Sequence, residues 1–411
     1  KFIRRYRGRL ALAALAMCTL LVATVVSLNY ARKERAAKVA MGEALYNAHL
    51  SEASALRQSG RMGQRTRALA AIAAAARIHP TAELRDEAIA AMALPDIELI
   101  GTLDAIPESN AVYAYDFVSD LLLTGRRYRR EIQRYRVATG ETLDPVPLPE
   151  APVGSDKLCL SPGGAILAVY GKPMVEGIAA RLSFYEVATG RKLCDVEGAN
   201  YQVQACAFYD SARKVLVPMD QGGIAEIDLN SGKEIRRIET VGRAYQVSSN
   251  TAETRFIVTM RDPKKIQIID ANRGVSIKSI SVSPPEQAAL SPGGRVIAYA
   301  GGSGSVRSQS LAKIDEKKLS PAIKMTGHLG LVNRVSFVLD GRFILTSSWD
   351  GTVRLWNASG SQVLTLEGGA AIGSPDGKRM LVQNGKRVRL FRLVPPPEVI
   401  TFSEATPTKA P

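Results

Sequence analysis

The sequence predicts a mainly β protein, a seven-bladed β-propeller preceded by a transmembrane helix and a short α-helical stalk. Residues 10–28 carry no charged side chain. From residue 97 onward, short apolar stretches alternate with Gly-, Pro- and Asp-containing turns in a unit of roughly 40 to 45 residues, a period typical of four-stranded propeller blades. The expected parts are a basic segment (1–9), the transmembrane helix (10–28), the stalk (29–96), the propeller (97–394) and a Pro-rich, flexible tail (395–411).

The apolar run is long enough to cross a bilayer once. At about 1.5 Å per residue it reaches about 28 Å, close to the thickness of a hydrocarbon core. No small-residue cleavage pattern follows it, because Leu28, Asn29 and Tyr30 occupy the relevant positions. We therefore expect an uncleaved anchor in contact with membrane lipid, with a removable signal peptide as the alternative.

The charges around the anchor predict its orientation. They sum to +5 before the run and +3 after it, which favours a cytoplasmic N-terminus and a periplasmic propeller. Of the net charge of +15, residues 1–40 supply +8, and the remaining +7 is spread over 371 residues. The composition therefore gives no reason to expect a nucleic-acid partner. The chain begins with Lys1 rather than Met, so we expect it to be part of a longer protein.

An alanine-rich helical pattern follows the anchor, with breaks near Gly60 and Pro80. Three helices are expected, from the anchor to about residue 59, over 64–78 and over 82–93. Thr81 is the expected N-cap of the third helix, and apolar residues such as Ile89 recur at helical spacing. These features suit a small antiparallel packing; a homodimer through the long helix stays open, although a strict heptad is absent.

Seven copies of the repeated unit can be aligned. Their first apolar residues, spaced by 50, 42, 42, 40, 47 and 35, are Ile132, Leu182, Ile224, Ile266, Val306, Val353 and Val388. One copy, GHLGLVNRVSFVLDGRFILTSSWDGTVRLWNASG over residues 327–360, resembles the WD40 repeat family. Gly327 and His328 match its Gly-His, Asp350 its tight-turn aspartate, and Trp356 with Asn357 its Trp-Asp. The other six copies keep only the pattern of strands and turns.

The two ends of the propeller are expected to meet. The last unit runs into Pro395, Pro396 and Pro397, which cannot continue a strand ladder, whereas residues 97–103 form a strand before the first full unit. In the WD40 family the first segment usually supplies the outer strand of the last blade. We therefore predict that residues 97–103 pair with the blade containing residues 371–393 and so hide both edges.

No catalytic, cofactor or metal site is expected. His328, Ser348, Asp350 and Trp356 combine a histidine, a hydroxyl and an acid, but in the resembled fold they form a buried hydrogen-bond relay within one blade. The chain has no kinase catalytic motif, no phosphate-loop motif and no metal-ligand spacing among its histidines and cysteines.

Two further groups of residues have alternative interpretations. A segment with interleaved tyrosines could bind an anionic partner, or could be a solvated strand edge and turn; its arginines are Arg126, Arg127, Arg129, Arg130, Arg134 and Arg136. The cysteines Cys18, Cys159, Cys194 and Cys206 are interpreted as small buried hydrophobes, and a Cys194–Cys206 bridge is the alternative in an oxidising compartment.

The order of the parts resembles the C-terminal half of bacterial membrane-bound Ser/Thr protein kinases that carry WD40 repeats. SGRMGQR (59–65) and ELRDEAIAAMALPD (83–96) carry this resemblance. It implies that a kinase domain would precede the anchor. We predict a non-catalytic sensor or scaffold propeller that binds a protein or an envelope ligand on one face. A free-standing envelope assembly scaffold is the first alternative, and a propeller enzyme with a funnel active site is the second.

Overall fold

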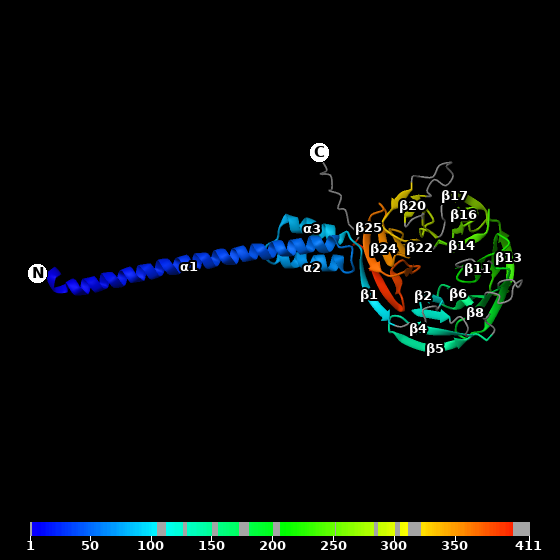
Figure 1. Cartoon of the computed structure of the whole chain (residues 1–411), viewed down its shortest axis with the longest axis horizontal. Helices are drawn as coiled ribbons and strands as arrows, with labels where there is room; N and C mark the ends of the chain where they lie inside the picture. The colour runs from blue at the N-terminus through cyan, green and yellow to red at the C-terminus, as the bar shows by residue number, and fades with distance from the viewer. Residues whose placement is uncertain are drawn as a thin grey trace, which may run out of the picture. The chain divides into compact units, whose positions relative to one another are not determined.

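The computed structural model describes residues 2–104, 112–125, 130–149, 155–171, 181–199, 206–250, 252–282, 287–300, 305–310 and 322–397. They form two compact units (Figure 1). A helical unit comprises the chain up to residue 94 except for residues 60–63. A β unit comprises residues 60–63 and the chain from residue 95 onward. The predicted tail beyond Pro397 lies outside the described residues.

Three helices make up the helical unit: α1 (Phe2–Gln58), α2 (Gln64–Ala76) and α3 (Ala82–Met92). Small side chains such as Ala53, Ala68 and Ala91 are fully buried where the helices meet, so the backbones can approach closely. Thr81 caps α3 as predicted, because its hydroxyl accepts the backbone N–H of Leu84 at 3.2 Å. Ile89, which we expected in the core, is 56% exposed, since α3 turns Leu84 and Ala91 inward instead.

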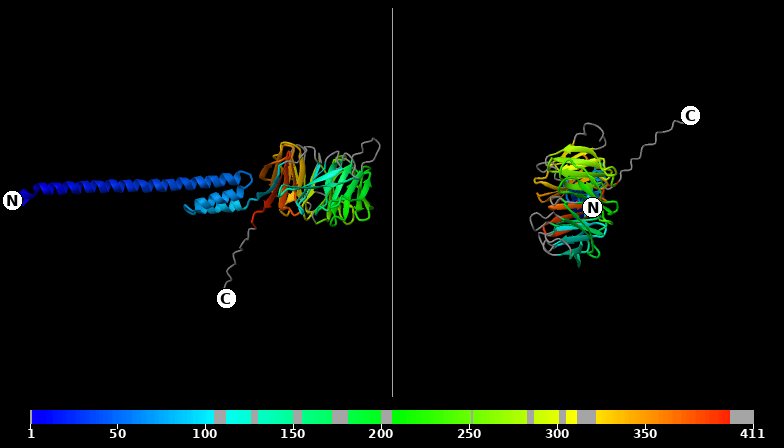
Figure 2. Two further views of the ribbon diagram at one scale, coloured as in Figure 1. Left: turned by 90° about the horizontal axis from the view of Figure 1, so that it is seen from below. Right: turned by 90° about the vertical axis from the view of Figure 1, so that its right-hand side faces the viewer.

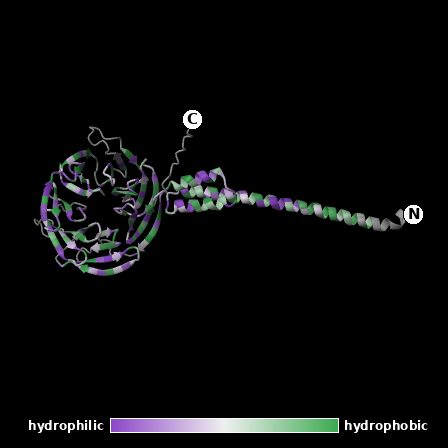
Figure 3. Cartoon of the chain, turned by 180° about the vertical axis from the view of Figure 1, so that it is seen from behind, coloured by the Kyte–Doolittle hydropathy of each residue, from purple (hydrophilic) through white to green (hydrophobic). Residues whose placement is uncertain are grey.

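Residues 14–28 of α1 are apolar and exposed (Figure 3). Its large apolar side chains between Leu12 and Leu28 are 55–72% exposed. By length and composition alone, this is the one helix among the described residues that could cross a membrane. Apolar surface of this extent is unfavourable in water and favourable in lipid.

The described residues of the β unit form seven four-stranded antiparallel sheets, the blades of a propeller. Blade 1 consists of β2 (Val112–Asp116), β3 (Leu121–Gly125), β4 (Glu131–Arg136) and β5 (Glu141–Pro147). Blade 2 consists of β6 (Ser155–Leu160), β7 (Ile166–Gly171), β8 (Arg181–Glu186) and β9 (Lys192–Glu197). Blade 3 consists of β10 (Ala207–Tyr209), β11 (Lys214–Pro218), β12 (Ile224–Asp228) and β13 (Lys233–Ile238).

Blades 4 to 7 continue the ring. Blade 4 consists of β14 (Ala244–Ser249), β15 (Arg255–Met260), β16 (Lys265–Asp270) and β17 (Ser276–Ser281), and blade 5 of β18 (Ala288–Leu290), β19 (Val296–Ala300), β20 (Val306–Ser310) and β21 (Ile323–Met325). Blade 6 consists of β22 (Val332–Val338), β23 (Phe343–Ser348), β24 (Thr352–Asn357) and β25 (Gln362–Glu367). Blade 7 consists of β26 (Ala370–Gly373), β27 (Arg379–Asn384), β28 (Arg387–Val394) and β1 (Asp96–Leu103).

The predicted closure of the ring is confirmed. Strand β1 pairs antiparallel with β28, from Asp96 opposite Val394 to Leu103 opposite Val388. The outer strand of blade 7 is therefore the first strand in the sequence, and residues 60–63 of the β unit contact the adjacent blade 6. The backbone N–H of Thr365 on β25 donates to the carbonyl of Gly60 at 2.7 Å. The closure leaves neither end of the ring with an unpaired edge.

The repeated sequence motif, an apolar strand followed by a turn such as VATG, corresponds to the third strand of each blade and the turn that follows. All seven aligned apolar residues, from Ile132 to Val388, lie on third strands. The glycine of phrases such as VATG has a left-handed backbone, with φ of 71° at Gly190 and 86° at Gly360. Side chains other than glycine rarely adopt this conformation, which explains why Gly recurs at this turn.

The hydrophobic core lies between neighbouring blades. Each apolar cluster of the β unit combines residues of two adjacent blades; one joins blades 2 and 3, and another joins blades 5 and 6. Figure 2 shows the ring of blades edge-on. Two faces follow from the antiparallel order. The inter-blade face carries the connections between blades and the turns between second and third strands, and the opposite face carries the other turns.

Candidate functional site

Blade 6 contains a chain of hydrogen bonds from a buried tryptophan to an aspartate. The Trp356 indole N–H donates to the hydroxyl oxygen of Thr346 at 2.8 Å. That hydroxyl lies 2.8 Å from Nε2 of His328, whose Nδ1 lies 3.0 Å from an Asp350 carboxylate oxygen. Trp356 is 1% exposed and His328 is 4% exposed. The relay therefore satisfies polar groups that would be costly to bury alone.

The partners of His328 define its protonation state. A carboxylate only accepts hydrogen bonds, so Nδ1 carries the proton and Nε2 accepts from the Thr346 hydroxyl. Burial lowers the pKa of His328, and its bond to Asp350 does not outweigh this effect. Burial alone would raise the pKa of Asp350, but hydrogen bonds from Thr352, the Leu329 backbone and His328 hold it well below its usual range. A neutral imidazole therefore bonds to an ionised carboxylate.

This arrangement predicts a loss of stability in mild acid. The pKa of His328 is lower in the folded protein than its unfolded value of about 6.5, so the unfolded chain binds the proton more readily. The stabilisation that the neutral His328 imidazole contributes is complete above the unfolded pKa and is lost as the pH falls through the folded pKa. We expect the wild-type Tm to decrease from pH 7.5 to pH 5 more steeply than that of His328→Gln. Equal slopes in thermal unfolding would contradict this account.

The relay also positions two loops on the inter-blade face. The Asp350 carboxylate accepts the backbone N–H of Leu329 at 2.9 Å, and the Trp349 N–H donates to the Leu331 carbonyl at 3.0 Å. Between these bonds the side chains of Leu329 and Trp349 extend into solvent, 93% and 72% exposed. We call Leu329 and Trp349 the blade-6 patch. It presents large apolar groups on a backbone that the buried relay fixes.

Gly330 allows the two loops to approach closely. A Cβ atom at this position would lie 2.8 Å from the backbone nitrogen of Asp350 and 3.1 Å from the carbonyl carbon of Trp349. Neither neighbour is a flexible side chain, so the loops would have to separate. We expect Gly330→Ala to lower the free energy of unfolding by about 1–3 kcal/mol. Gly369→Ala is the matched control, because nothing lies within 4 Å of its Cβ position; equal losses in urea titrations would refute this explanation.

The structure brings His328, Asp350 and Trp356 into one network and places Ser348 at its edge. The Ser348 hydroxyl accepts the backbone N–H of Asp350 at 3.2 Å. The hydroxyl that joins the histidine to the tryptophan belongs to Thr346, which sequence reasoning missed. Strand alternation could have identified it, because residues 346 and 348 point to the same side of β23.

The arginine-rich segment lies partly outside the described residues, since the structure does not describe Arg126, Arg127 and Arg129. The other three contact their own chain. Arg130 donates to the carbonyl of Pro149 at 2.9 Å and Arg134 to that of Asp144 at 2.7 Å, while Arg136 lies 3.5 Å from a Glu141 carboxylate oxygen. These contacts link each of the three side chains to a neighbouring segment of the same blade, although Arg130 and Arg136 stay exposed.

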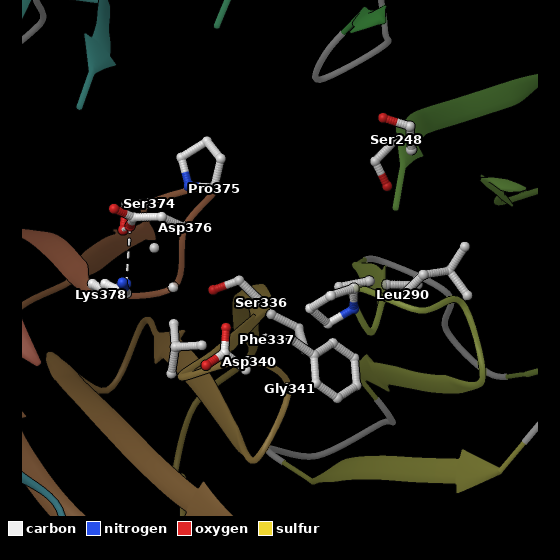
Figure 4. Close-up of a pocket in the computed structure, with 18 of the residues that line it drawn as sticks. Ser248, Leu290, Ser336, Phe337, Asp340, Gly341, Ser374, Pro375, Asp376 and Lys378 are labelled. Atoms are coloured by element: carbon white, nitrogen blue, oxygen red, sulfur yellow. Dashed lines mark hydrogen bonds between the residues drawn. The ribbon is translucent and has the colours of Figure 1, made fainter. Parts of the chain in front are cut away.

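A pocket of 460 Å³ opens on the opposite face, beside the turns of blades 5, 6 and 7 (Figure 4). Asp376 and Lys378 lie on one side of it, with Ser374, and Ser248 lies on the other. The Ser374 hydroxyl donates to Asp376, whose carboxylate also accepts the Lys378 N–H at 3.0 Å. The described lining contains no histidine or cysteine that could activate a serine as a nucleophile. These polar groups shape a turn.

Residues 319–357 match the family model described as WD domain, G-beta repeat. This segment is a WD40 repeat. The matched segment runs from the outer strand of blade 5, β21, through the first three strands of blade 6, and it includes all the residues of the relay. Together with the seven four-stranded sheets, the repeat supports a non-catalytic protein-interaction scaffold. Within the described ranges, no group of three or more His, Cys, Asp or Glu side chains could hold a metal ion.

Similar proteins were found over short segments. Ribosome assembly protein 4 of Saccharomyces cerevisiae is 46% identical over 41 residues, which are 10% of this chain and 8% of that protein. Notchless protein homolog of Arabidopsis thaliana is 46% identical over 46 residues (11% and 10%). Protein LST8 homolog of Drosophila melanogaster is 38% identical over 73 residues (17% and 23%). The chain thus matches less than a quarter of the length of each relative.

Proposed function

We propose that this chain is a membrane-tethered, non-catalytic propeller that binds a protein partner through the blade-6 patch. The observation that carries the proposal is the exposure of Trp349 and Leu329 on a rigid loop pair. Tryptophan is enriched among the residues that dominate binding energy at interfaces. A preorganised loop loses little conformational entropy on binding. The yeast relative is named as a ribosome assembly protein, which is compatible with a scaffold role.

The proposed tether is the uncharged, apolar run of α1 over residues 10–28. Its exposed leucines and valines suit a lipid environment, and the basic residues that flank the run favour a cytoplasmic N-terminus. The propeller would then lie in the periplasm. A reporter enzyme that is active only outside the cytoplasm, fused after Pro411, tests this placement. We expect activity in the full-length fusion, and an inactive reporter in an intact fusion would overturn the proposed topology.

The finer proposal is that the chain is the sensor portion of a receptor-like Ser/Thr protein kinase. It is supported by the order of basic segment, anchor, helices and propeller, and by the phrases at residues 59–65 and 83–96. A bound ligand would change the association or orientation of the chain across the bilayer. Sequencing the coding DNA upstream of Lys1 tests it. In-frame kinase motifs would support it, and a start codon within a few residues would favour the free-standing scaffold.

Co-purification with matched variants tests binding through the patch. Full-length protein is cross-linked in cells and isolated as the wild type, as Trp349→Ser and as Val118→Ser. Val118 is 75% exposed in the turn between β2 and β3, on the opposite face, so it controls for loss of an exposed apolar group. We expect one protein to be recovered equally with the wild type and Val118→Ser, and at least fivefold less with Trp349→Ser. Equal recovery with all three would overturn the proposal.

A further inference from the structure

Two of the four cysteines come together between blades 2 and 3. Cys159 lies on β6, the innermost strand of blade 2, and Cys206 immediately precedes β10, the innermost strand of blade 3. The Cys159 thiol donates to the backbone carbonyl of Cys206, with an Sγ–O distance of 3.4 Å. Cys206 belongs to the apolar cluster between these blades, and Cys159 packs against that cluster. The expected alternative paired Cys206 with Cys194, but Cys194 lies on β9, the outermost strand of its blade.

The surroundings distinguish the two thiols. Cys206 is 4% exposed and lies within the apolar cluster, whereas Cys159 is only partly buried. The positive charge of Arg334 acts on Cys159 from β22, the innermost strand of blade 6. Cys159 is therefore the more exposed of the two thiols and also lies near a positive charge.

The acidities of the thiols give an order of reaction. The neighbouring Cys206 thiol and the positive charge of Arg334 lower the pKa of Cys159. The neighbouring Cys159 thiol and burial raise the pKa of Cys206. Burial raises the pKa of Cys194 to about 11, which leaves very little thiolate at neutral pH. Because the thiolate is the nucleophile and Cys159 is also the more exposed of the two paired thiols, Cys159 reacts first and Cys194 does not compete.

We propose that Cys159 and Cys206 form a disulfide that links blades 2 and 3 when the propeller encounters a disulfide oxidant. The Cys159 thiolate attacks one sulfur of the oxidant and releases the other half as a thiol. The Cys206 sulfur then attacks Cys159 in the mixed disulfide and releases the second half. Two protein thiols lose two protons and two electrons, and one oxidant disulfide is reduced to two thiols. Placement in an oxidising compartment, part of the proposed function, would supply the oxidant.

Oxidation of the purified full-length protein tests this pairing. The reduced protein in detergent is treated with oxidised glutathione, free thiols are alkylated under denaturing conditions, and the peptides are mapped by mass spectrometry. We expect a Cys159–Cys206 linkage, with Cys18 and Cys194 alkylated. Closing a loop of this length raises the Tm by about 6 °C relative to the reduced form. Four alkylated cysteines, or a bridge that includes Cys194, would overturn the proposal.

Variants and cells separate the pairing from the proposed location. Cys194→Ser is the matched control and should oxidise like the wild type, whereas Cys159→Ala should leave Cys206 alkylated. Oxidation of Cys206 to a bridge in the Cys159→Ala variant would contradict the assigned partner. The redox state trapped in cells by acid and alkylation tests the location alone. A protein that forms the bridge in vitro but is fully reduced in cells would contradict the periplasmic placement and leave the pairing intact.

Discussion

Replacing Arg236 with Met should lower the free energy of unfolding by about 3–5 kcal/mol, because the buried carboxylate of Glu226 would lose its main partner. The two residues lie opposite each other on β12 and β13, with 2.5 Å between Arg236 Nε and a Glu226 oxygen. The Glu226 side chain is 4% exposed. Lys214, 4.0 Å away, is the next cation and compensates only weakly. Urea unfolding of the full-length protein measures the change.

Arg236 also joins blade 3 to blade 4. Its guanidinium donates to the backbone carbonyl of Ala271 at 2.6 Å and to that of Asn272 at 2.8 Å, in the turn that follows β16. The double variant Glu226→Gln/Arg236→Met removes the buried charge and should regain part of the loss. The control is Arg237→Met, since Arg237 pairs with Glu234 at an exposed position and should cost less than about 0.5 kcal/mol. Equal losses for Arg236→Met and Arg237→Met would refute the buried-charge explanation.

Trp356→Ala should lower the free energy of unfolding by a similar amount, about 3–5 kcal/mol. The indole is 1% exposed, packs between blades 5 and 6, and donates to Thr346, so the variant leaves a cavity and removes one hydrogen bond of the buried Thr346 hydroxyl. Trp356→Phe keeps most of the volume and should lose less. The control is Trp349→Ala, which should change stability by less than about 0.5 kcal/mol because Trp349 is 72% exposed.

Fluorescence gives an independent check, because the chain contains only two tryptophans. Emission from Trp349→Phe comes from buried Trp356 and should be blue-shifted and protected from iodide. Emission from Trp356→Phe comes from Trp349 and should be red-shifted and readily quenched. The opposite order would contradict the assigned burial of the two side chains.

The sequence predicted the parts of the fold that depend on local pattern and repetition. The period defined the blades, the recurring turn glycines marked the ends of third strands, and the prolines at residues 395–397 indicated that another segment must complete blade 7. Features that join distant residues were not predictable in this way. The Glu226–Arg236 pair required the register of two strands, and the contact of Cys159 with Cys206 required two neighbouring blades.

The candidate site was predicted in part for the same reason. His328, Asp350 and Trp356 stood out because they match a known repeat, whereas Thr346 carries no motif and is recognised only from its place on β23. The blade-6 patch was not predicted, since an exposed tryptophan and a buried one look alike in sequence. Helix α3 shows the limit of periodicity, because Ile89 fits the apolar spacing and yet is exposed.

The most direct test of the central claim, that the propeller binds a protein through blade 6, is site-specific photo-cross-linking in living cells. A photoreactive amino acid replaces Leu329 in one full-length variant and Val118 in another, both highly exposed and on opposite faces. We predict one discrete cross-linked protein from position 329, lost when Trp349→Ser is added, and none at the same mass from position 118. The same adduct from both positions, or an adduct at position 329 that is unaffected by Trp349→Ser, would contradict the account.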